Sequence, residues 1–184
     1  CKRSHSPYLC PTLSKNGLND YAYTLLLNED FPSWLYEVNM GATTIWERWN
    51  SVLPNGYVSD TGMNSMNHYS YGSIVEWMYR YMCGLNPVES HPGFKEVVIK
   101  PQTDDRLGWV ECEYLSAAGL YKISWKIEQG KTTYHVSVPF DSQAKFVLPK
   151  ASSQATINGE YNHDLVENSE VMLSAGDYKI ITVG

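Results

Sequence analysis

The spacing of hydrophobic positions changes near residue 86. Before it, apolar side chains recur at intervals of three and four residues, which is typical of amphipathic helices. After it, apolar and polar residues alternate in short runs, which is typical of strands. The pattern therefore predicts an α+β chain in two parts, with helices in residues 1–86 and an antiparallel β-sandwich in residues 87–184.

Three helices are expected in the first part. One covers residues 18–26, with Asn16 as its candidate N-cap. The second begins near Pro32 and ends at Gly41. Its expected apolar stripe consists of Trp34, Leu35 and Val38. The third, over about residues 70–83, has the strongest helical pattern. Its apolar stripe consists of Ile74, Trp77, Met78, Tyr81 and Met82, and Gly84 ends it.

Short alternating runs predict the strands of the second part. They cover residues 97–100, 109–114, 120–127, 132–139, 145–148, 171–173 and 178–183. Residues 128–131 and the pair Asn158-Gly159 are interpreted as hairpin turns, the latter because it suits two positive φ angles. Trp109 and Trp125 lie in alternating runs and are interpreted as core residues, like Trp34 and Trp77 on the helical stripes.

Composition narrows the classes of function. A net charge of −6 over 184 residues argues against a nucleic-acid partner, which needs a basic surface. There is no run of about 18 apolar residues, so we expect no membrane span. The four cysteines lack metal-ligand spacing, and neither a metal nor another cofactor is expected. A Cys1–Cys10 bridge stays open on spacing, and residues 1–5 lack the apolar region of a signal peptide.

The candidate chemistry centres on residues 41–49, Gly-Ala-Thr-Thr-Ile-Trp-Glu-Arg-Trp. Glu47 lies between Trp46 and Trp49. Indole rings that stack on sugar faces, together with a carboxylate for proton transfer, are typical of a site that acts on carbohydrates. A surface pair of Glu47 and Arg48 beside two core tryptophans is the alternative, and the spacing alone leaves both open. Three other acids, Glu37, Glu76 and Asp60, are expected on solvated helix faces or in a turn.

Further blocks follow and precede this motif in a fixed order. They are Phe31-Pro32-Ser33-Trp34-Leu35-Tyr36-Glu37, Met66-Asn67-His68-Tyr69-Ser70-Tyr71-Gly72, Trp77-Met78-Tyr79-Arg80, Pro92-Gly93-Phe94-Lys95 and Val98-Ile99-Lys100-Pro101. In this order and spacing the chain resembles the inverting α-L-rhamnosidases of glycoside hydrolase family 78, from about residue 17 onward. The resemblance implies a C-terminal fragment of an (α/α)₆ toroid followed by an antiparallel β-sandwich.

The resemblance also implies roles for three residues. Glu47 falls on the general base that activates a water molecule, His68 on a histidine that contacts the bound rhamnose, and Trp46 beside the base, where it would line the sugar pocket. Without the resemblance, the position of His68 is more typical of a helix-entry or packing histidine than of a sugar ligand. The general acid of the family lies upstream of the part that this chain matches, so we expect little or no turnover by the chain alone.

The implied partners are a rhamnose-containing glycoside or polysaccharide and the missing N-terminal catalytic part. Self-association through the exposed helices, or packing of the helix over residues 70–83 against the β-sandwich, would also cover their apolar stripes. Two other functions stay open. One is a noncatalytic carbohydrate-binding β-sandwich that uses exposed aromatics such as Trp109 or Trp125. The other is a structural half that completes an enzyme encoded elsewhere.

Overall fold

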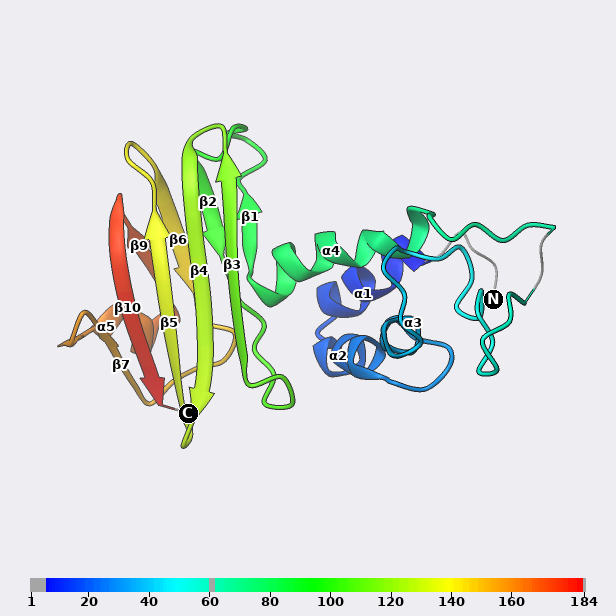
Figure 1. The fold of residues 1–184 in the computed structure, drawn as a ribbon. Helices are drawn as coiled ribbons and strands as arrows, with labels where there is room; N and C mark the ends of the chain where they lie inside the picture. Colours follow the sequence, from blue (N-terminus) through cyan, green and yellow to red (C-terminus); the bar gives the residue numbers. More distant parts are fainter. Residues whose placement is uncertain (1–5, 60–61, 184) are drawn as a thin grey trace. The chain divides into compact units, whose positions relative to one another are not determined.

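The computed structural model describes residues 6–59 and 62–183, in two compact units that divide between Trp77 and Met78 (Figure 1). The first unit is helical and the second is built of β-sheets. The prediction of a helical part followed by a β-sandwich is confirmed. Cys1 and Asp60, for which a disulfide and a turn role were considered, lie outside the described residues.

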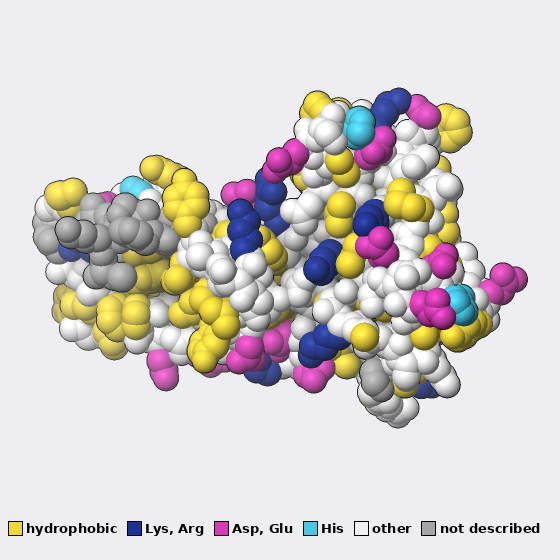
Figure 2. All heavy atoms as spheres, turned by 180° about the vertical axis from the view of Figure 1, so that it is seen from behind, with side chains coloured by type: hydrophobic (Ala, Val, Ile, Leu, Met, Phe, Trp, Pro, Cys, Tyr) yellow, Lys and Arg dark blue, Asp and Glu magenta, His cyan; other side chains and the backbone are white. Residues whose placement is uncertain are grey.

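Charged side chains of both signs are interspersed over the surface seen in Figure 2. This mixture agrees with the modest net charge of −6, and it gives this face no uniform potential that would attract a polyanion. Among the described residues, no helix is long and apolar enough to cross a membrane.

The helical unit contains three short helices, a long loop and a helical end. These are α1 (Ser6–Lys15), α2 (Asn19–Leu27), α3 (Trp34–Asn39), a 3₁₀ turn (Ser70–Ser73) and α4 (Ile74–Trp77). α1 and α2 lie side by side (Figure 1). Their core is formed by Tyr23, whose ring meets Trp77 edge to face at 5.2 Å, and the indole Nε1 of Trp77 donates to Ser14 Oγ at 2.8 Å.

The helix boundaries correct two expectations. α1 was not predicted, because Pro11 lies inside it and its apolar periodicity is weak. Asn16 follows α1 and does not cap α2, since its side chain donates to Thr12 O at 2.8 Å.

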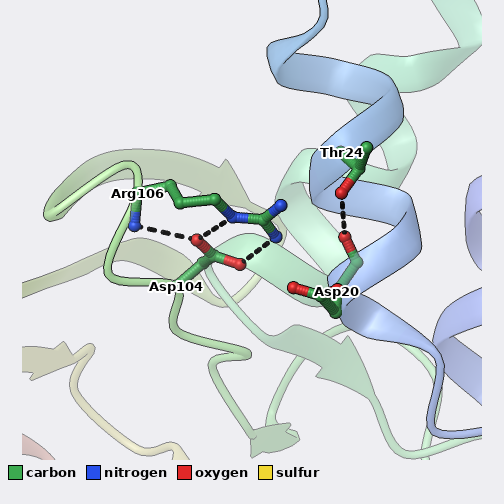
Figure 3. A network of polar contacts seen from close by, with 4 residues as sticks. All are labelled: Asp20, Thr24, Asp104 and Arg106. Atoms are coloured by element: carbon green, nitrogen blue, oxygen red, sulfur yellow. Dashed lines mark hydrogen bonds and ion pairs between the residues drawn. The ribbon is translucent and has the colours of Figure 1, made fainter.

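Within α2, Thr24 Oγ1 donates to Asp20 O at 2.8 Å (Figure 3). Ser33 caps α3 by accepting from Tyr36 N at 2.9 Å.

The predicted helix over residues 70–83 is helical throughout but changes its hydrogen-bond pattern. The 3₁₀ turn leads into α4, and a π-helical turn (η3, Met78–Met82) follows in the second unit. Gly84 ends it with φ of 78°, and a Cβ there would lie 2.2 Å from the carbonyl carbon of Lys100. Only glycine fits this position without displacing backbone.

The β-unit consists of two sheets. The four-stranded sheet has the order β1 (Leu85–Pro87), β2 (Glu96–Ile99), β6 (Gln143–Val147) and β9 (Glu170–Leu173). The six-stranded sheet has the order β3 (Trp109–Ser116), β4 (Gly119–Glu128), β5 (Lys131–Val138), β10 (Gly176–Val183), β7 (Gln154–Ile157) and β8 (Glu160–Tyr161). A short helix, α5 (His163–Glu167), precedes β9. All pairs are antiparallel except β2 with β6, which is parallel and was not expected.

Residue alternation along the central strands builds the core between the sheets. Trp125 is 1% exposed and its Nε1 donates to Met82 O at 2.8 Å, whereas Trp109 is 61% exposed. The core assignment was right for Trp125 and wrong for Trp109.

In the loop between β2 and β3, Arg106 donates to both carboxyl oxygens of Asp104, at 2.9 and 2.6 Å (Figure 3). These bonds hold the pKa of Asp104 below its usual value.

Candidate functional site

The predicted site residues lie on a long loop of the helical unit. Segments 44–51 and 64–68 of this loop lie beside each other and run in opposite directions. Ile45 O accepts from His68 N at 2.7 Å, Thr44 Oγ1 bonds to Met66 O, and Ser51 Oγ bonds to the side chain of Asn64. These bonds bring the Trp46–Glu47 pair and His68, which are 21 positions apart in sequence, onto adjoining segments of one loop.

The carboxylate of Glu47 is buried, with 8% of the residue exposed. Its Oε2 accepts from Ser65 N at 2.8 Å, while its own backbone N donates to Ser65 O, also at 2.8 Å. A buried carboxylate is costly unless hydrogen bonds compensate it. Burial with a backbone partner does not fit the alternative of a surface pair with Arg48. It fits a carboxylate that is held in one orientation.

Glu37 is a second buried carboxyl next to this segment. The residue is 3% exposed, its Oε2 accepts from Trp46 N at 3.4 Å, and its Oε1 has no hydrogen-bond partner. Burial raises the pKa of Glu37 to about 7, against the lowering effect of the bond from Trp46. The expectation that Glu37 is solvated is therefore wrong. α3 turns Glu37 inward and leaves Val38 61% exposed, which reverses the predicted stripe.

The imidazole of His68 is half-buried and stacks on the ring of Tyr69, with centroids 5.1 Å apart. Its Nδ1 accepts from Ser70 N at 3.2 Å. Because Nδ1 acts as an acceptor, the ring proton of the neutral imidazole lies on Nε2. Nε2 is thus a hydrogen-bond donor that can bond a sugar hydroxyl, because a hydroxyl oxygen accepts as well as donates.

The tryptophans around Glu47 differ in their packing. Trp46 is 5% exposed. Trp49 stacks on Tyr71 at a centroid distance of 3.6 Å and meets Trp34 edge to face at 5.0 Å. Trp34 is half-buried, and its Nε1 donates to Tyr71 O at 2.9 Å. This cluster ties α3 and the loop to the 3₁₀ turn, so the orientation of the Glu47 segment is fixed by packing on both sides.

The described residues supply one candidate base but no metal cluster. No group of three or more His, Cys, Asp or Glu side chains in residues 6–59 and 62–183 could hold a metal ion.

The last helix of the helical unit, α4, carries the acid Glu76, which is exposed as expected. Inverting hydrolysis needs two carboxyls about 6.5–9.5 Å apart with a water molecule between them. Glu37 is 3% exposed and lines a hollow of about 280 Å³ with Trp34 and Thr44.

Two family models match the chain in succession. Residues 5–82 match the bacterial alpha-L-rhamnosidase 6 hairpin glycosidase domain, and residues 84–163 match the bacterial alpha-L-rhamnosidase C-terminal domain. The first model accounts for the helical residues as part of a toroid of helical hairpins. The second accounts for most of the β-sandwich.

Curated relatives and solved structures agree with this division. An alpha-L-rhamnosidase of Alteromonas sp. (strain LOR) is 37% identical over 174 residues, which is 95% of this chain and 18% of the relative. One of Streptomyces avermitilis is 38% identical over 144 residues, or 78% of this chain and 14% of the relative.

Among solved structures, the Streptomyces avermitilis alpha-L-rhamnosidase complexed with L-rhamnose matches 96% of this chain and 17% of its own length, with 29% identity and a TM-score of 0.83. The native Aspergillus terreus enzyme matches 99% of this chain and 20% of its own length, with 30% identity and a TM-score of 0.84. The chain spans less than a quarter of each of these proteins. Matches of this kind in sequence and fold mean that the chain belongs to the bacterial α-L-rhamnosidase family, of which it corresponds to a C-terminal portion.

Proposed function

We propose that this chain supplies the general base of an enzyme that removes terminal α-L-rhamnosyl residues with inversion of configuration. Glu47 is the base, and residues up to about 86 complete the catalytic domain. The observation that carries the proposal is the buried Glu47 carboxylate, fixed by Ser65 N at 2.8 Å. A base that is held in place does not need to reorganise when the water molecule attacks.

In this mechanism Glu47 removes a proton from a water molecule on the face of the sugar opposite the leaving group. The attacking oxygen forms a bond to the anomeric carbon as the glycosidic bond breaks, and a general acid outside this chain protonates the leaving oxygen. The hydrogen bond from Ser65 N to Oε2 holds the carboxylate in one orientation.

His68 and Trp46 would contribute to sugar binding in different ways. The Nε2 donor of His68 can bond a rhamnose hydroxyl while Ser70 N and the Tyr69 ring hold the imidazole. Trp46 is 5% exposed, so its contact with sugar would be limited to the ring edge that reaches the surface. Its larger contribution is to anchor the peptide that carries Glu47.

The test uses a full-length enzyme, made by replacing the corresponding C-terminal portion of the Alteromonas relative with this chain. Glu47→Gln should lower kcat for an aryl α-L-rhamnoside by about 10²- to 10⁴-fold. Azide is a nucleophile that needs no deprotonation, so it should restore turnover of this variant and yield the inverted glycosyl azide. Glu76→Gln on the exposed face of α4 is the matched control. A full rate in Glu47→Gln would refute the assignment.

Exposed apolar side chains of α1 and α2 indicate where the rest of the enzyme packs. They are Tyr8, Leu9, Tyr21 and Leu25. Patches of this kind are typically covered by a partner. We infer that upstream helices cover them in the intact enzyme and that a second copy covers them in the isolated chain. Light scattering that gives a monomer at all concentrations would contradict self-association. Hydrolysis by the isolated chain that Glu47→Gln abolishes would show that no upstream part is needed.

A further inference from the structure

The outward face of the six-stranded sheet carries two rows of side chains that the proposed catalytic role does not use. The strand register places Trp109, Lys126 and Thr133 opposite one another on β3, β4 and β5. The next outward row consists of Glu111, Ser124, His135 and Lys179, the last on β10. Both rows line one hollow of about 530 Å³, on the face of the β-unit turned toward the viewer in Figure 1.

Trp109 gives this hollow an exposed flat apolar surface. Trp109 is 61% exposed, whereas Trp125, in the adjacent residue pair Val110–Trp125, is buried on the inward face of the same sheet. An exposed indole on a strand leaves a large apolar area in water. The C–H faces of a pyranose ring are flat and apolar, and they match such a surface in size.

The second row offers hydrogen-bonding groups beside the indole. Ser124 is half-buried, His135 is exposed, and both line the hollow with side chains that can donate and accept. Glu111 adds an acceptor and Lys179 a donor within the same row. A stacking surface next to several donors and acceptors is the combination that binds vicinal sugar hydroxyls.

The charge of the hollow restricts the class of ligand. Its lining contains two acidic side chains, Glu111 and Glu128, and two basic ones, Lys126 and Lys179. Lys126 is paired with Glu128 at 2.6 Å. A balanced lining has little attraction for a polyanion such as a single-stranded nucleic acid, which would need an excess of basic side chains. A neutral ligand rich in hydroxyl groups suits it.

We propose that this outward face of β3, β4, β5 and β10 is a binding site for a neutral saccharide chain. Trp109 stacks on one pyranose ring, and the row from Glu111 to Lys179 bonds its hydroxyls. The site lies within the β-unit and is separate in sequence from Glu47. The choice of a rhamnose-containing saccharide as the probe rests on the proposed function, whereas the stacking and bonding groups do not.

The experiment titrates the full chain with a neutral α-linked rhamno-oligosaccharide and follows amide and indole N–H resonances by NMR. Residues of β3, β4 and β5 should shift, and Trp109→Ala should weaken binding about tenfold or more. His135→Ala should weaken it several-fold. Phe140→Ala, at a residue that is 91% exposed in the same unit, is the matched control and should leave affinity unchanged. Thermal unfolding of each variant verifies its fold.

Three results would overturn the proposal. One is the absence of binding at millimolar saccharide. Another is binding that Glu47→Gln or His68→Ala abolishes and Trp109→Ala does not, which would place the sugar in the catalytic loop and leave the proposed function intact. The third is Trp109-dependent binding of a single-stranded oligonucleotide in preference to the saccharide. Saccharide binding that depends on Trp109 in a chimera without rhamnosidase activity would support this site and count against the proposed function.

Discussion

Glu47 and Ser65 exchange two hydrogen bonds of 2.8 Å, from Glu47 N to Ser65 O and from Ser65 N to Glu47 Oε2. The same residue of the second segment therefore fixes both the backbone and the carboxylate of the proposed base. Since the donor to Oε2 is a backbone amide, the orientation of Glu47 does not depend on the side chain of residue 65.

Ser65→Pro should remove the donor to Glu47 while leaving Glu47 itself in place. Loss of a hydrogen bond to a buried carboxylate costs about 1–3 kcal/mol, so the chain should unfold at lower denaturant concentration. In the full-length chimera kcat should fall more than KM rises. Ser65→Ala keeps the amide and is the control, although it loses the hydrogen bonds that Ser65 Oγ donates to Asn67 O and accepts from Asn67 N. Equal losses in both variants would show that the amide bond does not position the base.

Glu37→Gln tests the second carboxyl through the pH dependence of stability. The folded-state pKa of about 7 lies above the unfolded value near 4.5, so the folded chain binds the proton more tightly. Stability should then be highest at acidic pH and fall as pH rises from about 4.5 to about 7, by about 3 kcal/mol. The glutamine variant has no proton to lose and should lack this part of the decline.

Urea unfolding of the isolated chain between about pH 5 and pH 8 measures this effect. Glu76→Gln, at an exposed position, should keep the wild-type profile. A Glu37→Gln profile that declines as steeply as that of the wild type would mean that Glu37 is not protonated in the folded chain at acidic pH.

Gly84→Ala should be strongly destabilising because two effects combine there. Its φ of +78° disfavours any residue with a Cβ, and that Cβ would lie 2.2 Å from Lys100 C. Gly130 has φ of +74° and no atom within 4 Å of a Cβ, so Gly130→Ala isolates the backbone effect. We expect a cost of about 1 kcal/mol at Gly130 and about 3 kcal/mol or more at Gly84. Similar melting temperatures for both variants would contradict this.

Periodicity predicted seven of the ten strands of the described residues, because alternation is decided locally, and missed the short strands β1, β7 and β8. The Asn158-Gly159 turn could also be predicted from the sequence, and both residues have positive φ, 51° and 88°. The parallel pairing of β2 with β6 could not be predicted, because the two strands are far apart in sequence and nothing in either run specifies its neighbour. α1 was missed because the proline at position 11 outweighs its weak apolar pattern.

The site was predicted less completely than the fold. Glu47 and His68 stay predictions from the family motif, and the bonds that relate their segments come from a loop without periodic pattern. Glu37 was placed on a solvated face, because the stripe of a six-residue helix is too short to define a direction. The loop returns over α3 and encloses the carboxyl, with Trp46 N as its partner. The sequence signal that could have indicated the burial of Glu37 was the position of this charged residue next to apolar neighbours.

Trp125 and Trp109 lie on opposite faces of one sheet and should respond differently to the same substitution. The indole of Trp125 is 1% exposed and bonds Met82 O, at the end of the π-helical turn, at 2.8 Å. Trp125→Phe removes the hydrogen bond to this carbonyl and takes volume from a packed core, so we expect a loss of about 2–4 kcal/mol. Trp109→Phe changes an exposed ring and should cost less than about 0.5 kcal/mol. Urea unfolding of both variants measures the difference, and a large loss at Trp109 would mean that its ring supports the fold and is not free to serve as a binding surface.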